Sequence, residues 1–193
     1  MNATEHIVES YFRLCRGCFT QTDRKVDSGN NRQFDLLAYD LKKDEQFHIE
    51  ISVTHALTWC LTRENVGVEF EKKFFGAPAK RTSTSGAATD YEKGRSYFPQ
   101  IESAYQKIGF KPEKVKRVWV CWILKGKEEN SRPISFPFRS KHLNRVFDVE
   151  VLSLRDYILP ELEKTIRLSN YEDEVLRTLS LLKQRALQVK GKT

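Results

Sequence analysis

Glu50 is the residue whose surroundings most demand a chemical explanation. It lies in the stretch Phe47–Thr54, where apolar residues alternate with His48, Glu50, Ser52 and Thr54. This alternation is typical of a strand with one apolar and one polar face. A carboxylate among β-branched residues is unfavourable in a sheet unless its charge is satisfied, because an unpaired buried charge raises the free energy. We therefore expect water, a cation or a metal ion beside Glu50.

The elements that must position Glu50 begin with a helix and three strands. Asn2 and Glu5 have capping-box spacing, apolar residues then recur at helical period, and Gly17 ends the helix. Short turns separate the following segments, as expected of an antiparallel meander. The three strands are expected at Cys18–Val26, Arg32–Leu41 and Phe47–Thr54.

The second half of the chain predicts a helical crossover, two more strands and C-terminal helices. The apolar run Val118–Leu124 is typical of a strand covered on both faces. We expect the small and polar residues of Gly76–Thr89 to form a loop, and the segment after Leu124 to form another. The expected helices are Val66–Phe75, Tyr91–Gly109, Leu154–Ile166 and a last helix capped by Asn170 or Ser169, and the expected further strand is Val146–Leu152. This order implies an α/β fold with a central mixed sheet flanked by helices.

Composition predicts an ordinary globular chain with a basic surface. The 193 residues are 39% hydrophobic and carry a formal net charge of +7. That charge favours polyanionic partners. No apolar run approaches the roughly 20 residues of a membrane span, and the N-terminus lacks a signal segment, so we expect a cytoplasmic protein without membrane contact. We expect one domain over residues 1–166 and a helix over 167–193 that packs on it or mediates dimerisation.

The order of acidic residues and strands resembles a known nuclease superfamily. Glu5 or Glu9 lies on the first helix, Asp35 in the second strand, and Glu50-Ile51-Ser52 in the third. This pattern is similar to the PD-(D/E)xK, or restriction-endonuclease-like, superfamily over about residues 4–152. The resemblance implies an αβββαβ core with extra C-terminal helices. It also implies an endonuclease that hydrolyses phosphodiester bonds of DNA and depends on Mg²⁺ or Mn²⁺.

The acidic residues suit this chemistry. Asp35 and Glu50 lie on neighbouring strands, where paired Cβ atoms are about 5 Å apart, and their carboxylates could bracket a cation. The Ile51 carbonyl would then be a third ligand, and Glu5 or Glu9 would join through water. The alternative is a purely structural role, in which Asp35 and Glu50 form salt bridges on an exposed sheet face.

Ser52 occupies the position of the superfamily's lysine, so three alternatives are open. Lys72 or Lys73, from the helix after the hairpin, supplies the missing charge, or His48 and His55 assist the reaction. The second alternative is a site that works without a lysine, and the third is a protein that has lost cleavage.

Nucleic-acid contacts are expected from basic residues near the acidic pair, namely Lys25, Arg32, Lys80 and Arg81. DNA is the expected partner, with RNA as the other polyanion that fits. A homodimer is expected by analogy with enzymes that cut both strands of a duplex. The alternative functions are a catalytically inactive protein that binds nucleic acid and a protein-interaction subunit. The second alternative would use the leucine-rich stripe of Tyr171–Val189.

Overall fold

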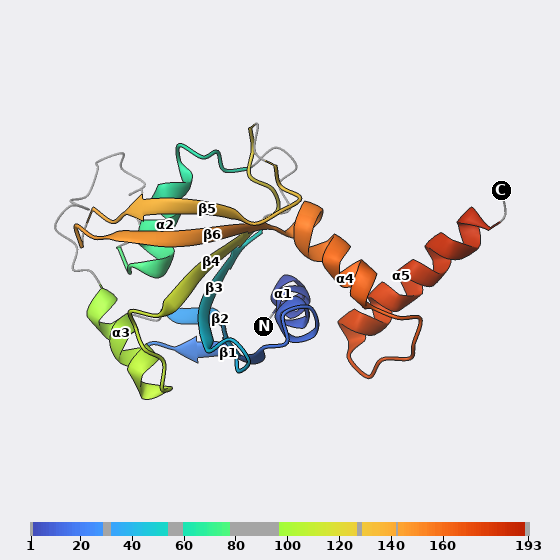
Figure 1. Ribbon diagram of the computed structural model, residues 1–193, viewed down its shortest axis with the longest axis horizontal. Coiled ribbons are helices and arrows are strands. Elements are labelled where there is room, and N and C mark those ends of the chain that lie inside the picture. The colour runs from blue at the N-terminus through green and yellow to red at the C-terminus, as the bar shows by residue number, and fades with distance from the viewer. Residues whose placement is uncertain are drawn as a thin grey trace, which may run out of the picture.

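The computed structural model describes residues 2–28, 32–53, 60–77, 97–126, 129–141 and 143–191. Within these ranges the chain is an α/β protein with a six-stranded mixed open sheet and five α-helices (Figure 1). The strands are β1 (Phe19–Lys25), β2 (Gln33–Asp40), β3 (Glu45–Ser52), β4 (Val115–Cys121), β5 (Ile134–Arg139) and β6 (Val146–Ser153). The helices are α1 (Ala3–Leu14), α2 (Val66–Phe74), α3 (Phe98–Lys107), α4 (Leu159–Thr165) and α5 (Glu174–Lys190), with a π-helical turn, η1 (Leu154–Ile158), before α4.

The sheet order is β1-β2-β3-β4-β6-β5, so the apolar strand β4 lies inside the sheet, as predicted. Strands β1, β2 and β3 form the predicted antiparallel meander. The chain then crosses over through α2 and α3 to β4, which pairs in parallel with both β3 and β6. A strand inside a sheet and in parallel pairing needs cover on both faces, which the helices provide.

Two sets of helices cover the two faces of the sheet. Helices α1 and α4 lie on one face, and α2 and α3 lie on the other (Figure 1). Phe47 and Ile49 of β3 are buried in the cluster that contains α1 and α4. His48 and Glu50 face the other side and are also buried, with 0% and 3% of their surface exposed. The alternation predicted for β3 is therefore correct, but its polar face is covered by α2 and α3.

One strand was missing from the sequence-based prediction. Strand β5 pairs antiparallel with β6 at the end of the sheet order, in a segment that the sequence suggested was a polar loop. Its burial alternates at every residue, with Ile134, Phe136 and Phe138 on the more buried side, but the strand contains Pro137. Proline is tolerated in an edge strand because one side of such a strand makes no ladder hydrogen bonds. The sequence therefore carried the alternation of a strand, which was passed over because of the proline and the polar residues on either side.

The C-terminal helices differ from the prediction in their first turns. Pro160 lies at the start of α4 rather than inside a continuous helix, and the π-helical turn η1 precedes it. Helix α5 is capped by Asp173, whose side chain accepts the Leu176 N–H, and not by Asn170 or Ser169. Helix α3 begins at Phe98; the part of its predicted range before Tyr97 lies outside the described residues.

Helix α5 is anchored to the domain through its first half. Leu176 and Ser180 are buried, and Lys183 Nζ donates to the main-chain carbonyls of Glu163 and Ile166 at 2.6 and 2.7 Å. Its far end projects from the body of the protein (Figure 1). The exposed apolar residues of its second half are Leu181, Leu182, Leu187 and Val189. Among the described helices, none combines the length and apolar character of a membrane span.

Candidate functional site

Asp35 lies where the ladder between β2 and β3 ends. The last paired residues are Leu36 and Ile49. Beyond them, the Ile51 N–H donates to Asp35 Oδ2 at 2.8 Å, so a side chain occupies the place of a ladder carbonyl. The Asp35 side chain is 15% exposed. Its carboxylate is therefore held at the end of the hairpin, beside the polar face of β3.

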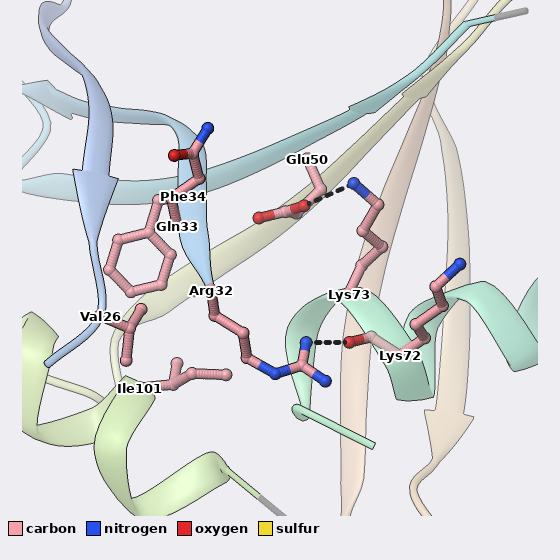
Figure 2. Close-up of a pocket in the computed structure, with 8 residues that line it drawn as sticks. All are labelled: Val26, Arg32, Gln33, Phe34, Glu50, Lys72, Lys73 and Ile101. Carbon is pink, nitrogen blue, oxygen red and sulfur yellow. Dashed lines mark hydrogen bonds and ion pairs between the residues drawn. The ribbon is translucent and has the colours of Figure 1, made fainter. Parts of the chain in front are cut away.

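Lys73 brings a positive charge to Asp35 and Glu50. Its Nζ lies 3.1 Å from Glu50 Oε2 and 3.5 Å from Asp35 Oδ2. Figure 2 shows the Lys73 side chain extended toward Glu50, whereas Lys72 points away. Lys72 Nζ lies 3.8 Å from Glu69, one turn earlier on the same helix. Of the two lysines named from the sequence, the structure brings only Lys73 to the carboxylates.

The orientation of α2 selects Lys73. Phe70 and Phe74 are fully buried one turn apart, and the Phe70 ring contacts Trp119 of β4 edge-on. These aromatic contacts fix which side of α2 faces the sheet. Lys73 follows Phe70 by three residues and so flanks the buried side of the helix. Lys72 lies about 100° further round the helix, toward water.

The other carboxylate oxygen of Glu50 is hydrogen-bonded to His48. The His48 Nε2 lies 2.7 Å from Glu50 Oε1, and the His48 Nδ1 lies 2.6 Å from the hydroxyl of Tyr105. Tyr105 comes from α3 and is fully buried. The site thus joins β2, β3, α2 and α3 through direct side-chain contacts.

Burial and unequal charge shift the pKa values of the cluster. Burial, together with the charge of Glu50, raises the pKa of Asp35 from 3.8 to about 6. Burial also opposes ionisation of Glu50, but the bond from His48 and the charge of Lys73 outweigh it and lower the pKa of Glu50. Burial would lower the pKa of Lys73, yet the two carboxylates raise it. The cluster therefore contains a protonated lysine between two acids, with Asp35 as the acid that ionises with difficulty.

A pocket of about 190 Å³ opens beside Glu50. Its charged wall consists of Glu50, Arg32, Lys72 and Lys73 (Figure 2). The Arg32 guanidinium donates to the carbonyls of Lys72 and Ala77 at 2.8 and 2.7 Å. These bonds fix Arg32 without neutralising its charge. The pocket is thus a basic recess with one carboxylate at its side, which suits an anionic ligand that also binds a cation.

The other acidic residues named from the sequence lie in different positions. Glu5 forms the predicted capping box with Asn2. Its negative charge also raises the pKa of Asp35 further. Glu9 instead accepts a hydrogen bond from the Thr20 hydroxyl at 2.7 Å. Glu5 is therefore the helix residue that the structure brings within electrostatic reach of Asp35.

The remaining residues named from the sequence lie near the site or beyond it. Ser52 is half-buried at the end of β3, in register with Cys121 of β4. Lys25 lies on β1 in register with Gln33 and is exposed. The residues outside the described ranges are His55, Lys80 and Arg81.

The residues present fit a Mg²⁺ ion whose other ligands are water and phosphate, and they do not fit a metal whose ligands all come from the protein side chains described. Within the described residues, no cluster of three or more Asp, Glu, His or Cys side chains forms a complete metal-binding set. Magnesium is commonly bound by one or two carboxylates, with water and substrate phosphates as the other ligands. Asp35 and Glu50 together carry one negative charge more than Lys73 balances, and a cation would relieve that excess. The Ile51 carbonyl, named from the sequence, belongs to the residue whose N–H fixes Asp35.

Sequence reasoning overlooked Tyr105 and underestimated His48. The position of His48, two residues before Glu50 on the same face of β3, is a signal that could have linked the two. Tyr105 is 57 residues from His48 and shows only helical apolar spacing, which also fits a core residue.

Comparisons with protein-family models, with curated proteins and with solved structures found no match for this chain. What the site can do therefore follows from its own residues. Two adjacent carboxylates can bind a divalent cation, and a protonated lysine can donate hydrogen bonds to water or to a phosphate oxygen. A basic pocket beside them can hold a phosphate group.

Proposed function

We propose that this protein is a Mg²⁺- or Mn²⁺-dependent endonuclease of the PD-(D/E)xK type, which hydrolyses phosphodiester bonds of DNA. Asp35 and Glu50 would hold the metal, and Lys73 would replace the lysine that is absent at Ser52. The observation that carries the proposal is the Lys73 ammonium, which reaches Glu50 at 3.1 Å and Asp35 at 3.5 Å from a different element. Lys73 on α2 would thus supply the positive charge that Ser52 lacks.

The role of Lys73 follows from its protonation state. Its pKa is raised above the ordinary value by the two carboxylates, so it stays charged at neutral pH and cannot serve as a general base. It can donate hydrogen bonds that orient an attacking water and stabilise negative charge on the phosphate. When bound, the divalent cation would supply Lewis acidity and lower the pKa of a coordinated water. Asp35 and Glu50 would hold that cation, with Lys73 beside it.

The substrate class follows from charge. The chain carries a net charge of +7, and Arg32 and Lys72 line the pocket beside Glu50. A phosphate next to the scissile bond would meet the Arg32 guanidinium, which its carbonyl partners already hold in place. DNA is the proposed substrate, and RNA is the competing polyanion that the cleavage assay must include.

The exposed end of α5 favours a second function, a contact with another protein. Leu182, Leu187 and Val189 are each more than half exposed on that end. Apolar residues grouped on one projecting helix are typical of an interaction surface. A homodimer would use this surface and would bring two sites to one duplex.

The decisive experiment measures cleavage of plasmid DNA, single-stranded DNA and RNA in Mg²⁺ and in Mn²⁺. The variants are Asp35→Asn, Glu50→Gln and Lys73→Met. The matched control is Lys164→Met, because Lys164 pairs with Glu161 one turn earlier on α4 and lies outside the pocket. We expect wild type and the control to cut, and Lys73→Met to cut about 100-fold more slowly, as when one transition-state donor is lost. Circular dichroism verifies that each variant is folded.

Two results would contradict the proposal. Equal cleavage by Lys73→Met and Lys164→Met would exclude Lys73 from the reaction. No cleavage of any substrate by wild type, together with salt-sensitive DNA binding that Asp35→Asn leaves unchanged, would instead support a protein that only binds nucleic acid.

A further inference from the structure

A hydrogen-bonded chain of buried side chains ends at Glu50. It runs from the Tyr105 hydroxyl to His48 Nδ1, and from His48 Nε2 to Glu50 Oε1. A carboxylate can only accept, so Nε2 carries the hydrogen. With its hydrogen on Nε2, the imidazole presents Nδ1 as the acceptor for the Tyr105 hydroxyl. The tautomer is assigned from these partners.

The His48 ring cannot turn away from Glu50. It is 0% exposed, and three aromatic rings surround it. The ring centroids of Phe34, Phe74 and Tyr105 lie 4.6, 5.1 and 5.7 Å from that of His48. Phe34 and Tyr105 also stack on each other at 5.3 Å. Because close-packed aromatic side chains leave no room for another rotamer, the imidazole is fixed before any ligand arrives.

The consequence for Glu50 is that its two oxygens have different roles. Oε1 is committed to His48, whereas Oε2 faces Lys73 and the Asp35 side of the site. A carboxylate that is free to rotate can bind a cation through both oxygens. In Glu50 the bond from His48 occupies one lone pair of Oε1 and fixes the plane of the carboxylate, so a cation that bound both oxygens would compete with His48 for Oε1.

We infer that His48 and Tyr105 are positioning residues that restrict Glu50 to binding a cation through Oε2 alone, and that they thereby make the site selective for Mg²⁺ over Ca²⁺. The inference rests on the proposed function, because it assumes that Glu50 binds a divalent cation. Mg²⁺ requires near-octahedral geometry with short bonds to single oxygens, whereas Ca²⁺ accepts six to eight ligands and commonly takes both oxygens of a carboxylate. Competition from His48 at one oxygen disfavours the arrangement that Ca²⁺ uses best.

The test measures the affinities of Mg²⁺ and Ca²⁺ for the full chain by calorimetry. His48→Leu removes both hydrogen bonds, and Tyr105→Phe removes only the outer one. His48→Gln keeps an N–H that can donate to Glu50. The matched control is Tyr39→Phe, because the Tyr39 hydroxyl also makes a single side-chain bond, to Asp44 at 2.8 Å, but on the exposed surface.

We expect the ratio of Ca²⁺ to Mg²⁺ affinity to rise about tenfold in His48→Leu, at the lower end of what loss of an outer-shell partner produces. Tyr105→Phe should raise it less, His48→Gln should restore a ratio near that of wild type, and Tyr39→Phe should leave it unchanged. A change confined to stability would not alter this ratio. In wild type, nitrogen NMR should show His48 protonated at Nε2 and unprotonated at Nδ1.

The outcomes separate the inference from the proposed function. If wild type binds Mg²⁺ but His48→Leu and Tyr105→Phe keep its ion preference, the inference is wrong and the metal site stands. If His48→Leu does not fold, an unchanged ratio in Tyr105→Phe overturns the inference. If wild type binds neither cation, the proposed function fails and the inference fails with it.

Discussion

The two faces of the sheet each contain a cluster of charged side chains, and the clusters differ in balance of charge. On the α1 face, Arg16 donates to Glu150 Oε1 at 2.7 Å and to the Tyr11 hydroxyl at 3.0 Å. Its guanidinium also lies over the rings of Phe12 and Phe47. One cation meets one anion there. On the opposite face, the Lys73 ammonium is shared between Asp35 and Glu50.

The pKa values show what this difference in balance does. Burial alone would lower the pKa of Arg16, but Glu150 and Tyr11 raise it, so the guanidinium stays charged. In the other cluster, the pKa of Asp35 rises to about 6 because burial and Glu50 outweigh Lys73. A balanced pair stabilises a fold, whereas an unbalanced cluster holds a charge that a ligand can neutralise. This contrast is why the Lys73 side of the sheet is the candidate site.

The largest expected effect comes from removing each cation in turn. Lys73→Met should lower the free energy of unfolding by about 3 kcal/mol, because two buried acids lose their shared partner. Arg16→Met should lower it by about 2 kcal/mol, since the Glu150 side chain is 34% exposed and can be hydrated. Urea unfolding with and without Mg²⁺ measures both. Added Mg²⁺ should recover part of the loss in Lys73→Met and none in Arg16→Met; equal recovery would abolish the distinction between the clusters.

A smaller effect of opposite sign is expected from Asp35→Asn. Folded Asp35 has a pKa of about 6 against 3.8 for the ordinary group, so between these values the folded state binds more protons than the unfolded state. Stability contributed by this group therefore falls as pH rises from about 4 through 6. Asp35→Asn should be more stable than wild type at pH 7 by about 1 to 2 kcal/mol, with the difference vanishing near pH 4.

The control for this prediction is Glu150→Gln, which should destabilise at pH 7 because Arg16 loses its ionised partner. Thermal unfolding across pH 4 to 8 measures both variants. Destabilisation by Asp35→Asn at pH 7 would mean that the Asp35 cluster is as well balanced as the Arg16 pair.

The smallest expected effect comes from Glu5→Gln. Glutamine preserves the capping box with Asn2 and removes only the charge that adds to the raised pKa of Asp35. NMR titration of the Asp35 carboxyl should show a small downward shift of its pKa. The matched control, Glu9→Gln, should show none, because the charges that shift the pKa of Asp35 come from Glu50, Lys73 and Glu5 and not from Glu9. Equal shifts would place both glutamates at the same electrostatic distance from Asp35.

The sequence was sufficient for the elements that depend on local periodicity. Alternation correctly predicted β3 and the shared face of His48 and Glu50, and helical spacing correctly predicted α1 and α2. The antiparallel register that brings Asp35 near Glu50 also follows from the short hairpin. Strand β5 was missed although Ile134, Phe136 and Phe138 alternate with exposed residues, because the strand is short, contains a proline and lies between polar segments.

The sequence by itself determined that two acids lie on neighbouring strands and that two lysines lie on the helix that follows them. Only the tertiary structure decided which lysine serves the site, since Phe70 and Phe74 set the rotation of α2 and neighbouring residues on a helix point about 100° apart. It also decided that Tyr105 reaches His48 across 57 residues. The physical reason is that periodicity records which side of an element is apolar, whereas packing between elements sets which side chains meet.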